Sequence, residues 1–90
     1  MNKQIMKIWD VHAPVKMLRS KPKQYKVIGM EEYYKRNKSF YGSVVVDKHH
    51  NIIDGYVIYY VAKKNKIEDI PVLVVSRMDR LKRFLRRVVR

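Results

Sequence analysis

Short apolar runs alternate with longer and more polar segments along the 90-residue chain. Runs at residues 3–11, 43–47 and 68–76 predict strands, because β-branched and other apolar side chains suit a pleated, partly buried surface. Residues 48–51 predict a hairpin turn into a further short strand that ends in Asp54-Gly55. The Val and Leu run of residues 68–76 predicts a strand that is buried on both faces.

Residues 28–40 predict a helix, because good helix formers are combined with glutamates early and cations late, the order that complements the helix dipole. We expect Met30, Tyr33 and Tyr34 to supply its inward face. Gly42 is expected to end it.

Three further segments predict helical structure. Residues 14–26 carry Pro22, which predicts a short helical turn followed by a loop. Residues 56–66 are apolar nearly all round for two turns, so this helix belongs in a core. Residues 77–90 predict a C-terminal amphipathic helix. Its apolar positions recur at helical spacing: Met78, Leu81, Leu85 and Val88.

The order of these elements predicts a single mixed α/β (α+β) domain, a mixed sheet flanked by helices. Ninety residues provide one modest core. We expect residues 1–76 to form the domain and residues 77–90 to form a basic helix that packs on it or extends from it.

The charge of the chain favours a polyanionic partner. The 21 Lys and Arg residues against 8 Asp and Glu residues give a formal net charge of +13, which creates a strong positive potential on so small a surface. Nucleic acid is the leading candidate, with DNA favoured over RNA, and an anionic membrane surface or an acidic protein remains open. Seven of the cations lie in the C-terminal segment: Arg77, Arg80, Lys82, Arg83, Arg86, Arg87 and Arg90. A second cluster consists of Lys16, Arg19, Lys21 and Lys23.

Other compositional features exclude whole classes of chemistry. The chain has no cysteine, which excludes disulfides, thiolate zinc sites and thiol catalysis. No apolar run is long enough to cross a bilayer, and the N-terminal segment lacks the apolar stretch of a secretion signal. These features suit a cytoplasmic protein, and a short, basic single domain would suit a phage or mobile element.

Residues 28–75 resemble the N-terminal domain of ParB-type chromosome-partition proteins and the related sulfiredoxin fold. The family pattern has an apolar strand ending in Asp, a hairpin turn, an apolar pair with Asp-Gly, a helix with an aromatic residue and an alanine, and a strand that opens near a proline. The sequence matches it at Val44-Val45-Val46-Asp47, at Ile52-Ile53-Asp54-Gly55, at Tyr59 and Ala62, and at Ile70-Pro71-Val72.

The sequence departs from this pattern at the family's nucleotide site. The resemblance implies arginines just after the glycine that reach nucleotide phosphates, but this chain has Val57 and Ile58 there. Sulfiredoxin chemistry also needs a cysteine, which is absent. The resemblance therefore implies the fold, with a nucleotide-pocket remnant at Asp54, Gly55 and Tyr56, and it implies neither CTP switching nor sulfinic-acid reduction. No cofactor is expected.

Few residues are candidates for catalysis. Asp47 and Asp54 flank the hairpin and could bind Mg²⁺ in a nuclease, although aspartates at strand ends more often cap turns. His12 could act as a general base, but no nucleophile lies nearby in the sequence. His49 and His50 have no third ligand at a recognisable spacing, so no metal site is predicted.

Three functional hypotheses follow from these observations. The first is a small, non-enzymatic nucleic-acid-binding protein that contacts phosphates through its basic segments. The second is a ParB-like nuclease or nucleotide hydrolase that uses Asp54, Gly55 and His12. The third is an interaction module that inhibits an acidic or DNA-associated protein.

Overall fold

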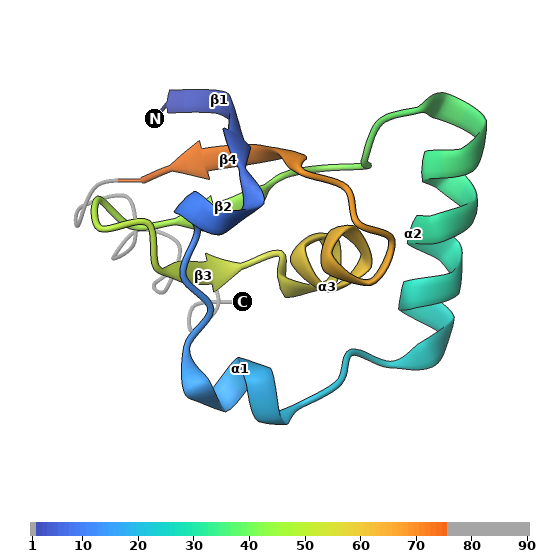
Figure 1. The fold of residues 1–90 in the computed structure, drawn as a ribbon, viewed down its shortest axis with the longest axis horizontal. Coiled ribbons are helices and arrows are strands. Elements are labelled where there is room, and N and C mark those ends of the chain that lie inside the picture. Colours follow the sequence, from blue (N-terminus) through green and yellow to red (C-terminus); the bar gives the residue numbers. More distant parts are fainter. Residues whose placement is uncertain (1, 76–90) are drawn as a thin grey trace, which may run out of the picture.

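The computed structural model describes residues 2–75. The expected helix at residues 77–90 and the domain boundary before it lie outside the described residues. A four-stranded sheet has the order β1-β4-β2-β3, in which β1 and β3 each pair antiparallel with their neighbour while β2 and β4 pair parallel (Figure 1). The strands are β1 (Asn2–Lys7), β2 (Val44–Val46), β3 (Ile52–Asp54) and β4 (Asp69–Val74).

The helical elements lie between and beside these strands. They are η1 (Ile8–Asp10), α1 (Val15–Arg19), α2 (Gln24–Asn37) and α3 (Tyr56–Lys64). Helix α3 contacts β2, β4 and η1 on one side and α2 on another, so it stands between the sheet and α2 (Figure 1). The predicted mixed α+β domain is confirmed.

The core lies where α3 meets the sheet. Val44 and Val46 of β2 and Ile70 and Val72 of β4 have no exposed surface, because alternate residues of both strands point toward the helix. Ala62 of α3 is equally inaccessible. The small alanine side chain lets the helix approach the sheet closely. Helix α3 is thus a core helix, as its apolar sequence predicts.

Strand β4 differs from its prediction. Ile70 and Val72 are buried on one face, but Pro71 and Leu73 on the other face are only half-buried, so burial on both faces is wrong. Strand β2 begins opposite Val72, so no strand lies beside Pro71 on that side of β4. The backbone N–H that proline lacks is therefore not needed for a hydrogen bond to β2.

The first strand occupies only the first part of the apolar run at residues 3–11. It ends at Lys7, and residues 8–10 form a 3-10 turn, after which His12 pairs with Asn51 beside β3. The chain thus leaves one edge of the sheet at β1 and reaches the opposite edge. Trp9, at 61% exposure, lies on the surface of this crossing.

Helix α2 begins four residues earlier than expected, at Gln24, because Pro22 lies just outside the helix and does not interrupt it. Its fully buried residue is Val27, which was not predicted. Met30 and Tyr34 are half-buried and pack against the core as predicted, whereas Tyr33 is 37% exposed. The earlier start also leaves the first turn without an acidic residue.

Helix α2 also ends differently from its prediction. Lys38 adopts a left-handed conformation with φ of 55° and donates its N–H to the Tyr34 carbonyl at 2.7 Å, so the helix ends at Asn37 and not at Gly42. At the other helix contact, Glu31 accepts a hydrogen bond of 2.8 Å from Asn65 Nδ2 and lies 3.5 Å from Lys64 Nζ. These bonds join α2 to the end of α3.

Gly55 fixes where α3 begins. Its φ is +80°, and a Cβ at this position would lie 2.6 Å from the Ser43 carbonyl oxygen and 3.0 Å from Val44 Cα. Both neighbouring atoms belong to the backbone, so neither can move cheaply. Only glycine provides both the conformation and the close approach.

Three glycine substitutions separate these two effects. Gly55→Ala should lower the free energy of unfolding by about 3 kcal/mol, because it combines backbone strain with the collision. Gly42→Ala should cost about 1–2 kcal/mol, because Gly42 has φ of +88° but open space around it. Gly29→Ala in α2 should add about 0.5–1 kcal/mol of stability. Urea unfolding measures all three, and equal losses for Gly42 and Gly55 would contradict the close approach.

Candidate functional site

The start of α3 holds the residues expected to form a nucleotide-pocket remnant. The Gly55 N–H donates a hydrogen bond of 2.9 Å to Asp54 Oδ1, so this carboxylate lies at the helix start. Tyr56 and Val57 are half-buried, whereas Ile58 is 2% exposed and belongs to the core. Of the two positions where the resemblance implies arginines, one therefore faces the interior.

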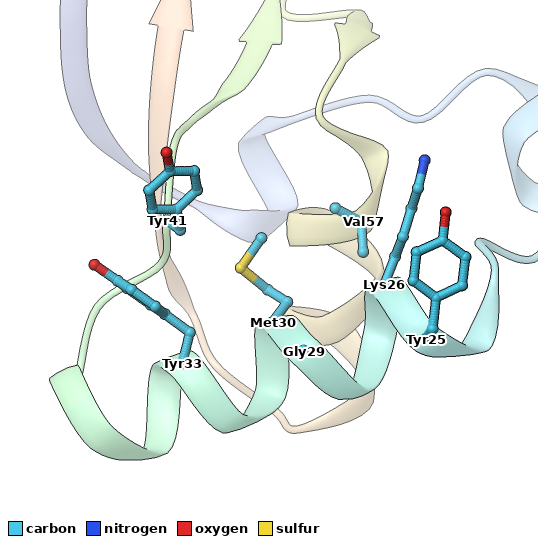
Figure 2. A pocket seen from close by; sticks show the side chains of 7 residues that line it. All are labelled: Tyr25, Lys26, Gly29, Met30, Tyr33, Tyr41 and Val57. Atoms are coloured by element: carbon cyan, nitrogen blue, oxygen red, sulfur yellow. The ribbon is translucent and has the colours of Figure 1, made fainter.

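Val57 lines a pocket of about 330 Å³ on the side of α3 that faces α2. Figure 2 shows its side chains pointing into a common hollow, with Met30 and Val57 in the middle and tyrosines at both ends. The lining residues come from three parts of the chain: Tyr25, Lys26, Met30 and Tyr33 of α2, Tyr41 of the following loop, and Val57. Lys26 is the one cation among them. The surroundings of Val57 are thus aromatic and aliphatic.

The tyrosines of this pocket were not predicted as a group. Tyr33 and Tyr41 meet edge to face with ring centroids 5.6 Å apart, and Tyr25 and Tyr41 are 67% and 71% exposed. Tyr25, Gly29 and Tyr33 recur every four residues, which is helical spacing. That signal becomes visible only when the helix start is placed at Gln24.

Asp47 occupies the hairpin turn and organises its backbone. Its Oδ1 accepts hydrogen bonds from the N–H groups of His49 at 2.8 Å and Asn51 at 2.9 Å. Partial burial would raise the pKa of the carboxyl group, but the hydrogen bonds from Asn51 and His49 outweigh it, and the pKa lies below its usual value. Asp47 therefore does what turn-capping aspartates do.

The remaining candidates for catalysis lie along the hairpin and the segment beside it. The backbone of His12 pairs with residues 50 and 52, and its side chain is exposed. His50 Nδ1 lies 3.2 Å from the Asp10 carbonyl oxygen. Within residues 2–75, no group of three or more His, Asp or Glu side chains could hold a metal ion. Asp54 pairs with Val45, two residues before Asp47.

The described cations all lie on the surface. Every Lys and Arg between residues 3 and 75 is exposed, and of these only Lys7 and Lys64 form ion pairs within that range, with Asp69 and Glu31. The second cluster of the sequence analysis, Lys16, Arg19, Lys21 and Lys23, occupies α1 and the loop before α2, and it is called the α1 cluster below. The cations of residues 77–90 lie outside the described residues.

None of the helices in residues 2–75 is long and apolar enough to cross a lipid bilayer.

Comparisons with solved structures identify the fold. A Pnob8-like ParB-N domain shares 19% identity with a TM-score of 0.66, over 81% of this chain and 29% of that chain. Sulfiredoxin from Arabidopsis thaliana shares 17% identity with a TM-score of 0.67, over 100% of this chain and 99% of that chain. ParB from Caulobacter crescentus, in a complex with CTP-γ-S, shares 12% identity with a TM-score of 0.65, over 84% of this chain and 45% of that one.

The fold is therefore ParB/sulfiredoxin-like, as the sequence motifs indicated. The chain spans less than half of either ParB chain and nearly the whole sulfiredoxin chain. No protein-family model and no curated protein matches the sequence significantly. At these identities the likeness concerns the fold.

Two substitutions at the start of α3 test how far the site can accept a guanidinium group. Ile58→Arg should lower the free energy of unfolding by about 4 kcal/mol, because it places a charge where side chains are excluded from water. Val57→Arg should change it by less than about 1 kcal/mol, because a long side chain at the pocket can reach solvent. Ile58→Met, which conserves volume, should cost less than about 1.5 kcal/mol. Thermal unfolding provides the comparison, and an Ile58→Arg protein of normal stability would contradict the assigned burial.

Asp47 predicts a pH-dependent stability. Because folding lowers the pKa of Asp47, its stabilising effect is present above the unfolded pKa of about 3.9 and is lost as the pH falls through the folded value. Asp47→Ala should cost about 1–2 kcal/mol at neutral pH, and Asp47→Asn, which keeps an accepting oxygen, should cost less. Urea unfolding at pH 7 and at about pH 2 measures the change. The wild type should lose its advantage over Asp47→Asn in acid, and an advantage that persists would argue against the capping role.

Proposed function

We propose that this chain, which has the ParB/sulfiredoxin-like fold, is a small non-enzymatic nucleic-acid-binding protein that binds mainly through phosphate contacts. The observation that supports this most directly is the net charge of +13 together with the exposure of every described cation. Exposed cations near a polyanion release its bound counterions, which drives binding regardless of base sequence. DNA is the favoured partner.

The arrangement of the charge supports an extended contact. The α1 cluster places four exposed cations within eight residues, from Lys16 to Lys23. The C-terminal segment contributes seven more against a single acid, Asp79, in residues 77–90. Such an excess is larger than solubility requires. Both segments are assigned to phosphate contacts.

The surroundings of the α3 start also favour binding over nucleotide chemistry. A phosphate-binding site on this scaffold would use donors beside the helix start, and the pocket beside Val57 is lined by tyrosines, a methionine and one lysine. Asp47 is engaged in its turn by two backbone N–H groups. The observations therefore favour a protein that holds a polyanion along its surface.

The salt dependence of binding tests the proposal. Fluorescence anisotropy of labelled duplex DNA, titrated at several salt concentrations, should give a steep loss of affinity with rising salt. Changing Arg83, Arg86 and Arg87 together to Ala should reduce the slope of log K against log salt by about 2 to 3, because each phosphate contact contributes about 0.9. An unchanged slope would remove the C-terminal segment from the interface.

The matched control removes the same charge elsewhere. Lys35, Arg36 and Lys38 lie at the end of α2, away from both assigned segments in sequence. Their triple Ala variant should keep most of the slope. An equal loss in both triple variants would mean that only net charge matters. Weak binding of the wild type to duplex, single-stranded DNA and RNA alike would overturn the proposed function and direct attention to an acidic protein partner.

A further inference from the structure

A second aromatic pocket lies on the face of α3 that is turned toward α1. Its volume is about 300 Å³, at the lower end of the range for small-ligand pockets. Helix α3 supplies most of the lining, and Leu18 of α1 forms the facing wall. The α3 residues are Tyr56, Tyr59, Tyr60, Lys63 and Lys64. The pocket thus combines three aromatic rings with two cations.

The three rings are arranged as a partly open platform. Tyr56 and Tyr59 are nearly parallel, with an interplanar angle of 24° and centroids 6.0 Å apart, while Tyr60 stands at 66° to Tyr56. Tyr59 is 8% exposed and packs in the core, whereas Tyr56 and Tyr60 are half-buried. Tyr59 therefore supports the platform, and the other two rings retain accessible surface for a ligand.

The hydroxyl of Tyr56 remains a neutral hydrogen-bonding group. Burial, together with the nearby Tyr59 and Tyr60 hydroxyls, raises the pKa of Tyr56 above its usual value. A neutral phenol can both donate and accept a hydrogen bond. It can therefore bond a polar group of a strand that passes the edge of the ring, such as a sugar or a phosphate oxygen.

The cations at this pocket lie beside the aromatic rings, where they could contact the phosphates of a polyanion whose base enters the pocket. Lys63 Nζ lies 5.6 Å from the centroid of the Tyr59 ring, so a positive charge stands directly beside the aromatic surface. Lys64 shares its charge with Glu31, whereas Lys63 forms no ion pair within residues 3–75. Leu18 belongs to the same short helix as Lys16 and Arg19 of the α1 cluster.

The apolar wall of this pocket keeps much of its surface accessible. Leu18 is 53% exposed, although the neighbouring Met17 packs against the core. An exposed leucine that faces half-buried tyrosines, with cations beside it, matches the composition of single-strand binding surfaces, in which bases stack on aromatic rings and cations hold the phosphates.

We propose that this pocket holds one unpaired base of a single-stranded nucleic acid, stacked on the ring of Tyr56 with the ring of Tyr60 against its edge. Lys63 and the α1 cluster hold the adjoining phosphates. The inference rests on the proposed nucleic-acid-binding function and adds a preference for unpaired nucleotides. It assigns a base to this pocket and not to the pocket at Val57. That pocket holds a single lysine and lies on the other side of α3, facing α2.

The test compares single-stranded and duplex DNA at one salt concentration. The double variant Tyr56→Leu/Tyr60→Leu keeps apolar bulk but removes both accessible rings, and it should bind a short single strand about tenfold or more weakly. Its affinity for duplex DNA of the same length should not change. A 2-aminopurine in the strand reports stacking directly, and its fluorescence should be quenched by the wild type and not by the variant.

The matched control is Tyr25→Leu/Tyr41→Leu, which removes two still more exposed tyrosines from the pocket at Val57. It should bind the single strand as the wild type does. A similar loss in both double variants would overturn the proposal, because the effect would then be a general one of surface tyrosines.

A strand with abasic sites tests the same contact without altering the protein. Wild-type protein should bind it about as weakly as the Tyr56→Leu/Tyr60→Leu variant binds the intact strand, and combining both changes should cause little further loss. Salt-dependent binding with equal affinity for intact and abasic strands would overturn the base pocket and leave the proposed function standing. If the double variant also weakens binding of a poly-glutamate peptide, the pocket belongs to an acidic protein partner and the proposal fails.

Discussion

The close approach of α3 to the backbone that enters β2 governs the rest of the molecule. At Gly55 the helix start lies against Ser43 and Val44 with no room for a side chain, so the axis of α3 is set at the sheet surface. With the axis set there, Ile58 and Ala62 face the core. The two remaining sides of the helix then face α1 and α2, and each of them lines an aromatic pocket.

Most of this central unit could be predicted from the sequence, but less of the structure around it could. The hairpin with Asp47 and Gly55 and the apolar helix after it could be predicted, because local spacing and glycine placement determine them. The start of α2 could not, since basic residues after Pro22 suit a loop and a helix equally and the local sequence does not decide between them. The end at Lys38 was missed for a related reason, because a left-handed lysine leaves no pattern in the sequence.

The types of residue in the candidate sites could be predicted from the sequence, but their positions relative to one another could not. The basic segments follow from composition, but their relation to the tyrosines of α3 depends on where α1 packs. The apolar sequence of their helix predicts a core position, yet Tyr56 and Tyr60 are half-buried and line a pocket with the exposed Leu18 of α1. Whether an aromatic residue packs or remains available is decided by tertiary contacts that no single segment encodes.

The position of β4 in the sheet has a consequence for the order in which the protein can assemble. This strand is the last one along the described chain, yet it lies inside the sheet between β1 and β2. Strand β1 therefore has no sheet partner until residues 69–74 have been synthesised, and its pairing closes a loop of more than sixty residues. Loops of that size slow folding, so during synthesis the hairpin and α3 can organise while the N-terminal strand waits.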